Sequence, residues 1–126
     1  MRDSRFVAVH RSGLLTKENH RLLMRWAREC SERVLPLLDG NIDARLIRAL
    51  HVAEEWENGR VPVGDAMKAS LGAHAAAQAS AHPVSAAVAR SVGQAAATAH
   101  MADHSLGAAL YVLKAAKLGG RSVDEE

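Results

Sequence analysis

Cysteine is almost missing from this sequence of 126 residues, which contains Cys30 and no other. A lone cysteine excludes an internal disulfide and fits a reducing compartment, so we expect a cytoplasmic protein. Cys30 falls on the apolar side of a helical pattern, with no histidine or lysine near it in sequence. We therefore expect a small buried hydrophobic residue there rather than a nucleophile.

Long apolar runs are also lacking. No stretch approaches the roughly 20 apolar residues that span a bilayer, because His, Arg, Gln and Asp interrupt the alanine-rich region. The N-terminal segment MRDSRFVAVHRSG has neither a long apolar core nor a small-residue cleavage site. We expect no secretory signal and no membrane partner.

The motifs that mark many enzymes are absent. The sequence has no GxSxG nucleophile turn, no GxxxxGK phosphate loop followed by Ser or Thr, and no GxGxxG after a strand. We therefore expect a protein that is not an enzyme, needs no cofactor, and works by binding a partner.

Aromatic residues and strand patterns are scarce, and alanine is abundant. The chain has one Phe, two Trp and one Tyr, and no alternation of β-branched residues beyond its first residues. Alanine favours helices and lets their axes approach closely. These features predict an all-α fold, a single domain over residues 1–126 that forms a compact bundle of about five helices.

Capping and breaking residues divide the chain into helices. Thr16, Asp43 and Asp65 are expected N-caps, and Gly40 and Gly59 are expected stops. A helix unbroken from 83 to 118 would be too long for such a domain, so we expect a break near 101–105, with Asp103 or Ser105 as the next cap. The expected helices cover about 17–38, 43–58, 66–80, from 83 to that break, and from it to 118, between an N-terminal arm (1–15) and a polar tail (119–126).

The last of these helices is apolar on most sides, as a central helix would be. We therefore expect it in the middle of the bundle. Its large apolar residues are Leu106, Leu110, Tyr111, Leu113 and Leu118.

Charge is nearly balanced overall, with a formal net charge of +2, but it is uneven along the chain. The sequence predicts a basic solvent face on the first helix and an acidic one on the second, and we expect a partner to bind one of them. The basic face could instead contact the phosphates of a nucleic acid. We do not favour this interpretation, because residues that would contact bases are missing and the net charge is small. The basic face comprises Arg21, Arg25 and Arg28, and the acidic face comprises Glu54, Glu55 and Glu57.

The segment TAHMADHSLGAA (98–109) carries the most chemically distinctive residues. On a helix, His100, Asp103 and His104 would share one face, and two histidines with a carboxylate can hold zinc. The alternative is that these residues cap helix ends or form hydrogen bonds across a helix junction. We favour that alternative and expect no metal cofactor, because the HExxH motif is absent.

Small residues recur at helical spacing in the last two helices. We expect them to let these helices pack closely against their neighbours, and a homodimer is the other use of such a surface. The residues are Gly93, Ala96, Ala97, Gly107 and Ala108.

Three segments together resemble one protein family. They are HRLLMRWARECSERVLPLL (20–38), EEWENG (54–59) and ARSVGQAAATAHMADHSLGAALYVLKA (89–115). In their order they resemble the Imm-5-like putative immunity proteins of bacterial polymorphic toxin systems, over about residues 17–118. The resemblance implies a small helical protein that binds a cognate toxin and neutralises it. A nuclease toxin, with a basic groove, would favour the acidic face.

Overall fold

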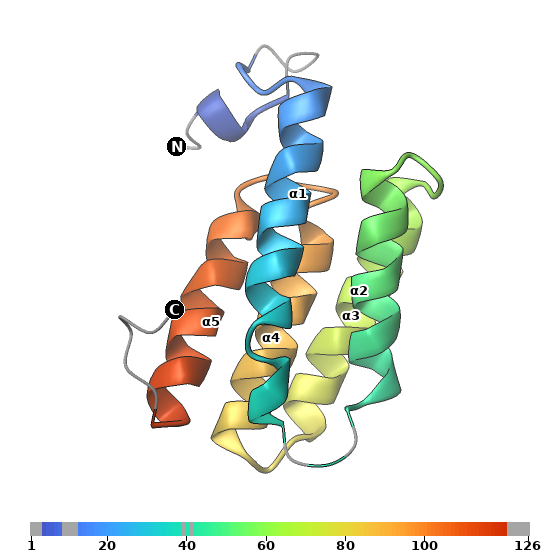
Figure 1. Cartoon of the computed structure of the whole chain (residues 1–126). Coiled ribbons are helices and arrows are strands. Elements are labelled where there is room, and N and C mark those ends of the chain that lie inside the picture. The colour runs from blue at the N-terminus through green and yellow to red at the C-terminus, as the bar shows by residue number, and fades with distance from the viewer. Residues whose placement is uncertain (1–3, 9–12, 39, 41, 121–126) are drawn as a thin grey trace.

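The computed structural model describes residues 4–8, 13–38, 40 and 42–120. Within them the chain forms five α-helices, and its only β-type pairing is an isolated bridge between Ala8 and Leu15. The predicted all-α fold of about five helices is therefore confirmed. Residues 1–3 and 9–12 of the expected arm and 121–126 of the expected tail lie outside the described residues. The elements are η1 (Ser4–Phe6), α1 (Lys17–Glu32), η3 (Leu35–Leu37), α2 (Ala44–Glu57), α3 (Val63–Ala79), α4 (Pro83–Ala97) and α5 (His104–Leu118) (Figure 1).

Local signals fix most of the helix ends. The Asn19 backbone N–H donates to Thr16 Oγ1 at 3.1 Å, and the Arg45 N–H donates to Asp43 Oδ1 at 2.9 Å, so both expected N-caps are confirmed. Gly59 ends the turn after α2 with a φ of 74°, which favours glycine.

Two expected boundaries were wrong. The helix predicted over 17–38 stops at Glu32, and η3 follows. Pro36 explains the stop, because its ring would clash with the carbonyl four residues earlier, that of Glu32. The third helix begins at Val63 rather than after Asp65, with Pro62 at the N-cap and Asp65 inside the first turn, where the helix dipole favours an acid.

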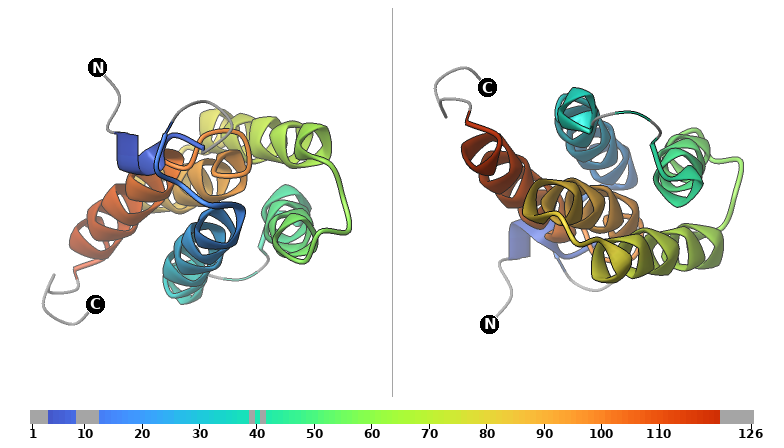
Figure 2. Two further views of the ribbon diagram at one scale, coloured as in Figure 1. Left: turned by 90° about the horizontal axis from the view of Figure 1, so that it is seen from above. Right: turned by 90° about the horizontal axis from the view of Figure 1, so that it is seen from below.

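The helices form two layers. Figure 2 shows α3, α4 and α5 side by side in one row, with α1 and α2 packed across it. The expectation that the last helix is central was wrong. α4 is central, because it packs against each of the other four α-helices, whereas α5 packs mainly against α4 and α1.

Side-chain size explains why α4 is central. Its buried residues are Ala, Val, Ser and Gly, which let neighbours approach on several sides. α5 instead leaves Leu106, Leu110, Leu113 and Leu118 exposed. An apolar composition on most sides therefore did not mean burial on most sides.

Buried hydroxyl groups join the layers. Ser91 of α4 donates to the Ala108 carbonyl of α5 at 2.9 Å, and its oxygen lies 2.7 Å from the Ser31 hydroxyl of α1. Because Ser91 has already donated its proton, Ser31 is the donor of the second bond. This chain of hydrogen bonds satisfies two fully buried hydroxyls and fixes α1, α4 and α5 relative to one another.

Candidate functional site

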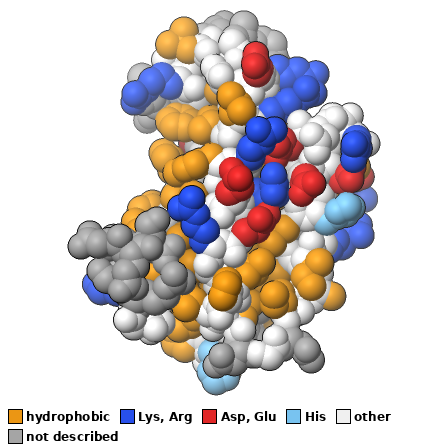
Figure 3. All heavy atoms as spheres, viewed as in Figure 1, with side chains coloured by type: hydrophobic (Ala, Val, Ile, Leu, Met, Phe, Trp, Pro, Cys, Tyr) orange, Lys and Arg blue, Asp and Glu red, His pale blue; other side chains and the backbone are white. Residues whose placement is uncertain are grey.

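The basic and acidic faces predicted from the sequence meet at the junction of α1 and α2. Arg25 Nε lies 2.6 Å from Glu57 Oε2, and Arg28 Nη2 lies 3.1 Å from Glu57 Oε1. Arg28 Nη1 also lies 2.8 Å from Glu32 and 3.6 Å from Glu54. We call Arg25, Arg28, Glu32, Glu54 and Glu57 the α1–α2 charge cluster. Figure 3 shows acidic and basic side chains gathered together in the middle of this face.

The inner part of the charge cluster is buried. The side chain of Glu57 is 5% exposed and that of Arg28 is 13% exposed. Burial acts to lower the pKa of Arg28, but hydrogen bonds to Glu32 and Glu57 and the charges of these residues outweigh it and raise that pKa. Glu57 and Glu32 therefore stabilise the charged form of Arg28, and the pair of Arg28 and Glu57 holds α1 against α2.

The outer part of the charge cluster is open to solvent. The side chains of Arg25, Glu54 and Glu32 are 54%, 56% and 42% exposed. These three groups stand around the buried pair, so a partner could reach them without disturbing it.

The remaining two residues of the predicted faces lie near the charge cluster. Arg21 lies beside the last turn of α2, where a Cβ at position 59 would be 3.2 Å from Arg21 Nη2. A cation there complements the negative end of the α2 dipole. Glu55 lies 3.5 Å from Arg60 and 3.8 Å from His51.

The two predicted faces are therefore not separate, and their residues Arg28 and Glu57 are buried rather than open to solvent. Periodicity marked Arg28 and Glu57 as polar positions outside the apolar stripe of each helix, and it did not show that α1 and α2 turn these sides toward each other. The carboxylates neutralise much of the arginine stripe, which leaves less free positive charge for phosphate contacts than the sequence suggested.

The segment around His100, Asp103 and His104 is not one helix face. α4 ends at Ala97 and α5 begins at His104, so His100 and Asp103 lie in the connection, which begins slightly before the break expected near 101–105. Asp103 stands at the N-cap position of α5, but its side chain forms no capping hydrogen bond with that helix. In the described part of the chain, no three His, Cys, Asp or Glu side chains come together in a way that could hold a metal ion.

Two histidine contacts at helix junctions escaped the sequence interpretation. The first involves His20 of α1, whose Nε2 donates to the Thr98 carbonyl after α4 at 2.5 Å. Its ring also packs on Trp56 of α2, with centroids 4.8 Å apart. Burial lowers the pKa of His20, and the bond to the Thr98 carbonyl opposes that effect in part.

The second contact involves His74, which lies between α3 and α4. Arg90 Nη1 lies 3.4 Å from His74 Nδ1, and because arginine only donates, this nitrogen accepts and the ring is neutral. Burial lowers the pKa of His74, and the charges of Arg90 and His104 lower it further. His104 is itself bonded through Nδ1 to Gln94 Oε1 at 2.6 Å, which is the hydrogen bond across a helix junction that the sequence favoured over a metal site.

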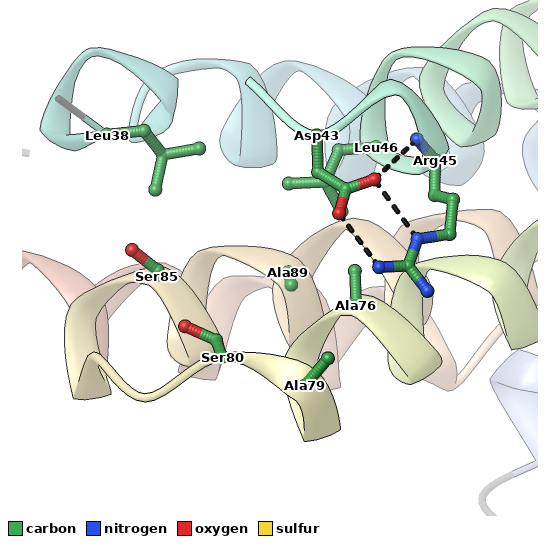
Figure 4. A pocket seen from close by; sticks show the side chains of 9 residues that line it. All are labelled: Leu38, Asp43, Arg45, Leu46, Ala76, Ala79, Ser80, Ser85 and Ala89. Atoms are coloured by element: carbon green, nitrogen blue, oxygen red, sulfur yellow. Dashed lines mark hydrogen bonds and ion pairs between the residues drawn. The ribbon is translucent and has the colours of Figure 1, made fainter. Parts of the chain in front are cut away.

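A pocket of about 250 Å³ lies between the start of α2 and the junction of α3 with α4 (Figure 4). Its charged wall is the pair Asp43 and Arg45, whose side chains are joined by bonds of 3.1 and 2.9 Å. Hydrogen bonds from Arg45 lower the pKa of Asp43. The other lining residues are leucine, alanine and serine.

An exposed apolar surface runs along α1 and α5, and sequence reasoning missed it. Leu22 and Trp26 of α1 are 48% and 42% exposed, and four leucines of α5 are also exposed. Figure 3 shows hydrophobic side chains gathered on this side, next to the charge cluster. The three- and four-residue spacing of the α5 leucines was visible in the sequence, where it was interpreted as the mark of a central helix.

Cys30 is half-buried and packs against the core, as its position on the apolar side of α1 indicated. In the described part of the chain, no helix is both long and apolar enough to cross a membrane.

Comparison with known proteins returns one family. Residues 13–126 match the family model described as "Imm-5 like putative immunity protein". Neither the curated proteins nor the solved structures include a match to the chain. The resemblance predicted from the three sequence segments is confirmed over nearly the whole length, and the chain belongs to the Imm-5 like family.

Proposed function

We propose that this protein is an immunity protein, which binds a cognate toxin and blocks the toxin's active site or a surface that the toxin requires. The observation that carries the proposal is the family match over residues 13–126.

The α1–α2 charge cluster is the surface that we assign to the toxin. Arg28 and Glu57 hold both helices in place, so little conformational entropy is lost when a partner binds. Arg25, Glu54 and Glu32 stand at its exposed edge, where charges accelerate encounter and select the partner. A toxin with basic groups would pair with Glu54 and Glu32.

The test begins with affinity capture from the host at moderate salt, followed by co-expression of each retained protein with this chain. The proposal requires a retained protein that is toxic alone and harmless in co-expression. If the preparation instead retains nucleic acid that salt removes, or no toxic protein, the immunity role is contradicted.

Charge reversal tests the surface. Glu54→Lys should weaken toxin binding by about tenfold or more, since it places a like charge against the toxin's basic groups. Lys68→Glu, at an exposed position on α3, is the control and should bind normally. Undiminished protection by the Glu54→Lys variant would exclude this surface.

A further inference from the structure

The outer side of the layer formed by α3, α4 and α5 carries four polar side chains that cross all three helices. Arg90 Nη1 of α4 donates to His74 Nδ1 of α3 at 3.4 Å. One turn further along α4, Gln94 Oε1 accepts from Nδ1 of His104, the first residue of α5, at 2.6 Å. Arg90 and Gln94 are four residues apart and share one side of α4, whereas Val92, two residues from each, points the opposite way into the core. We call these four side chains the outer polar row.

Two glycines bring the outer polar row together. A Cβ at position 93 would lie 2.7 Å from His74 Nε2, and a Cβ at position 107 would lie 2.8 Å from Gln94 Oε1. Gly93 and Gly107 therefore let these two side chains lie directly against the neighbouring helix. The small residues that the sequence analysis expected to permit close packing thus hold the row half-buried at the surface.

The outer polar row is rich in hydrogen-bond donors. Arginine carries five N–H donors, and His74 accepts from one nitrogen of Arg90. In the described part of the chain, no carboxylate forms an ion pair with Arg90. Gln94 uses its oxygen for His104, so its amide N–H groups point to no described acceptor. His104 Nε2 adds another donor when its ring is protonated. A half-buried guanidinium without a counter-charge, beside further donors, is the arrangement that an oxyanion satisfies.

We propose that the outer polar row binds a phosphate group, held by Arg90 and Gln94 of α4 and by His104 of α5. Donors that come from two helices suit a tetrahedral oxyanion, which accepts through several oxygens, better than a carboxylate, which the arginine fork satisfies alone. The charge of this layer also favours an anion. Between residues 63 and 118 the cations are Lys68, Arg90, Lys114 and Lys117, and the acids are Asp65 and Asp103.

This site is separate from the proposed toxin surface. The α1–α2 charge cluster belongs to the two helices that pack across the other side of the layer, as Figure 2 shows. None of the side chains in the outer polar row contacts Arg28 or Glu57. Phosphate binding therefore neither requires the immunity role nor follows from it.

Titration with inorganic phosphate, followed by NMR of the Arg90 Nε–H and the Gln94 side-chain amide, tests the site. Both signals should shift and saturate with phosphate, whereas sodium chloride at equal ionic strength should leave them in place. Read from the Gln94 amide, Arg90→Gln should weaken phosphate binding by about tenfold or more, since it removes charge-assisted hydrogen bonds. Arg90→Lys should also weaken it, because lysine keeps the charge and loses the fork.

Lys114→Gln is the matched control. It removes the same charge from an exposed position on α5, and the affinity for phosphate should change by less than about twofold. Circular dichroism checks that the Arg90 variants fold. Signals that do not respond to phosphate, or respond equally to chloride, overturn the proposal, as does an equal loss of affinity in Arg90→Gln and Lys114→Gln. Acetate that binds as tightly as phosphate overturns the assignment to phosphate. Because no toxin enters this experiment, its failure leaves the proposed immunity role untouched.

Discussion

Among the individual side chains, Glu57 is central to the charge cluster, because its nearly buried carboxylate forms ion pairs with two arginines. Both of its oxygens lie within hydrogen-bonding distance of a guanidinium, one from Arg25 and one from Arg28. Removing one member of such a pair lowers the free energy of unfolding by more than the intact pair contributes to it, since the remaining partner is left charged and desolvated. Arg28 depends on it most, because its Nε is already buried with no hydrogen-bond partner among the residues that the structure describes.

We therefore expect Glu57→Gln to lower the free energy of unfolding by about 2 kcal/mol, a value below that of a fully buried pair because Arg25 is half exposed. Urea denaturation measures the change. Glu54→Gln is the matched control on the same helix, and it should cost less than about 0.5 kcal/mol, since Glu54 is 56% exposed and 3.6 Å from Arg28. Equal losses of unfolding free energy in the two variants would show that the burial of Glu57 does not determine how strongly the charge cluster stabilises the protein.

At the level of helices, the close approach of α3 to α4 depends on Gly93. The His74 ring packs against the Gly93 Cα, and Ser70 of α3 donates to the Gly93 carbonyl at 2.8 Å. A side chain at position 93 would push the two helices apart. Gly72, in the interior of α3, faces no such restriction, because a Cβ there would lie 3.9 Å from its nearest neighbour, Arg45 Cβ.

These two glycines predict effects of opposite sign. Gly93→Ala should destabilise the protein by about 1–3 kcal/mol through overpacking, despite the better helix propensity of alanine. Gly72→Ala should stabilise it by about 0.5–1 kcal/mol, because propensity acts there alone. Thermal unfolding followed by circular dichroism distinguishes the two. If Gly93→Ala raised the melting temperature, the His74 contact would be unimportant.

On the scale of the whole molecule, His20 links the two layers, His74 links α3 to α4 within one layer, and both make stability depend on pH. Their pKa values are lowered in the folded protein from an ordinary value of 6.5. The unfolded chain therefore binds more protons between each folded pKa and 6.5. The stability from the neutral rings is fully present above about pH 6.5 and is lost as the pH falls toward the folded pKa values.

Urea denaturation at about pH 7.5 and about pH 5 should show this loss, with a slope of at most about 1.4 kcal/mol per pH unit for each histidine. Replacing both residues by glutamine removes the titrating groups, and although it lowers stability at neutral pH, it should flatten the dependence. A double variant as sensitive to this pH change as the unmodified chain would assign the effect to other groups.

The sequence by itself determined the helices and most of their ends. Thr16 and Asp43 cap helices, Pro83 begins one and Gly59 ends one. Each acts on backbone groups only a few residues away, so these signals can be recognised without knowledge of the fold. The clash of Pro36 with the carbonyl of Glu32, which ends α1, is equally local. The ordered segments that resemble a family were also visible in the sequence alone.

Only the tertiary structure decided which sides of the helices meet. Arg28 and Glu57 are 29 residues apart in the chain, and their pairing depends on the rotation of α1 and α2 about their axes, which helical periodicity leaves open. Helical periodicity likewise leaves open which helix is central, and in this fold it is α4 rather than α5. Burial there is set by how closely neighbours can approach small side chains from several directions, and the hydrophobicity of a single helix does not contain that information.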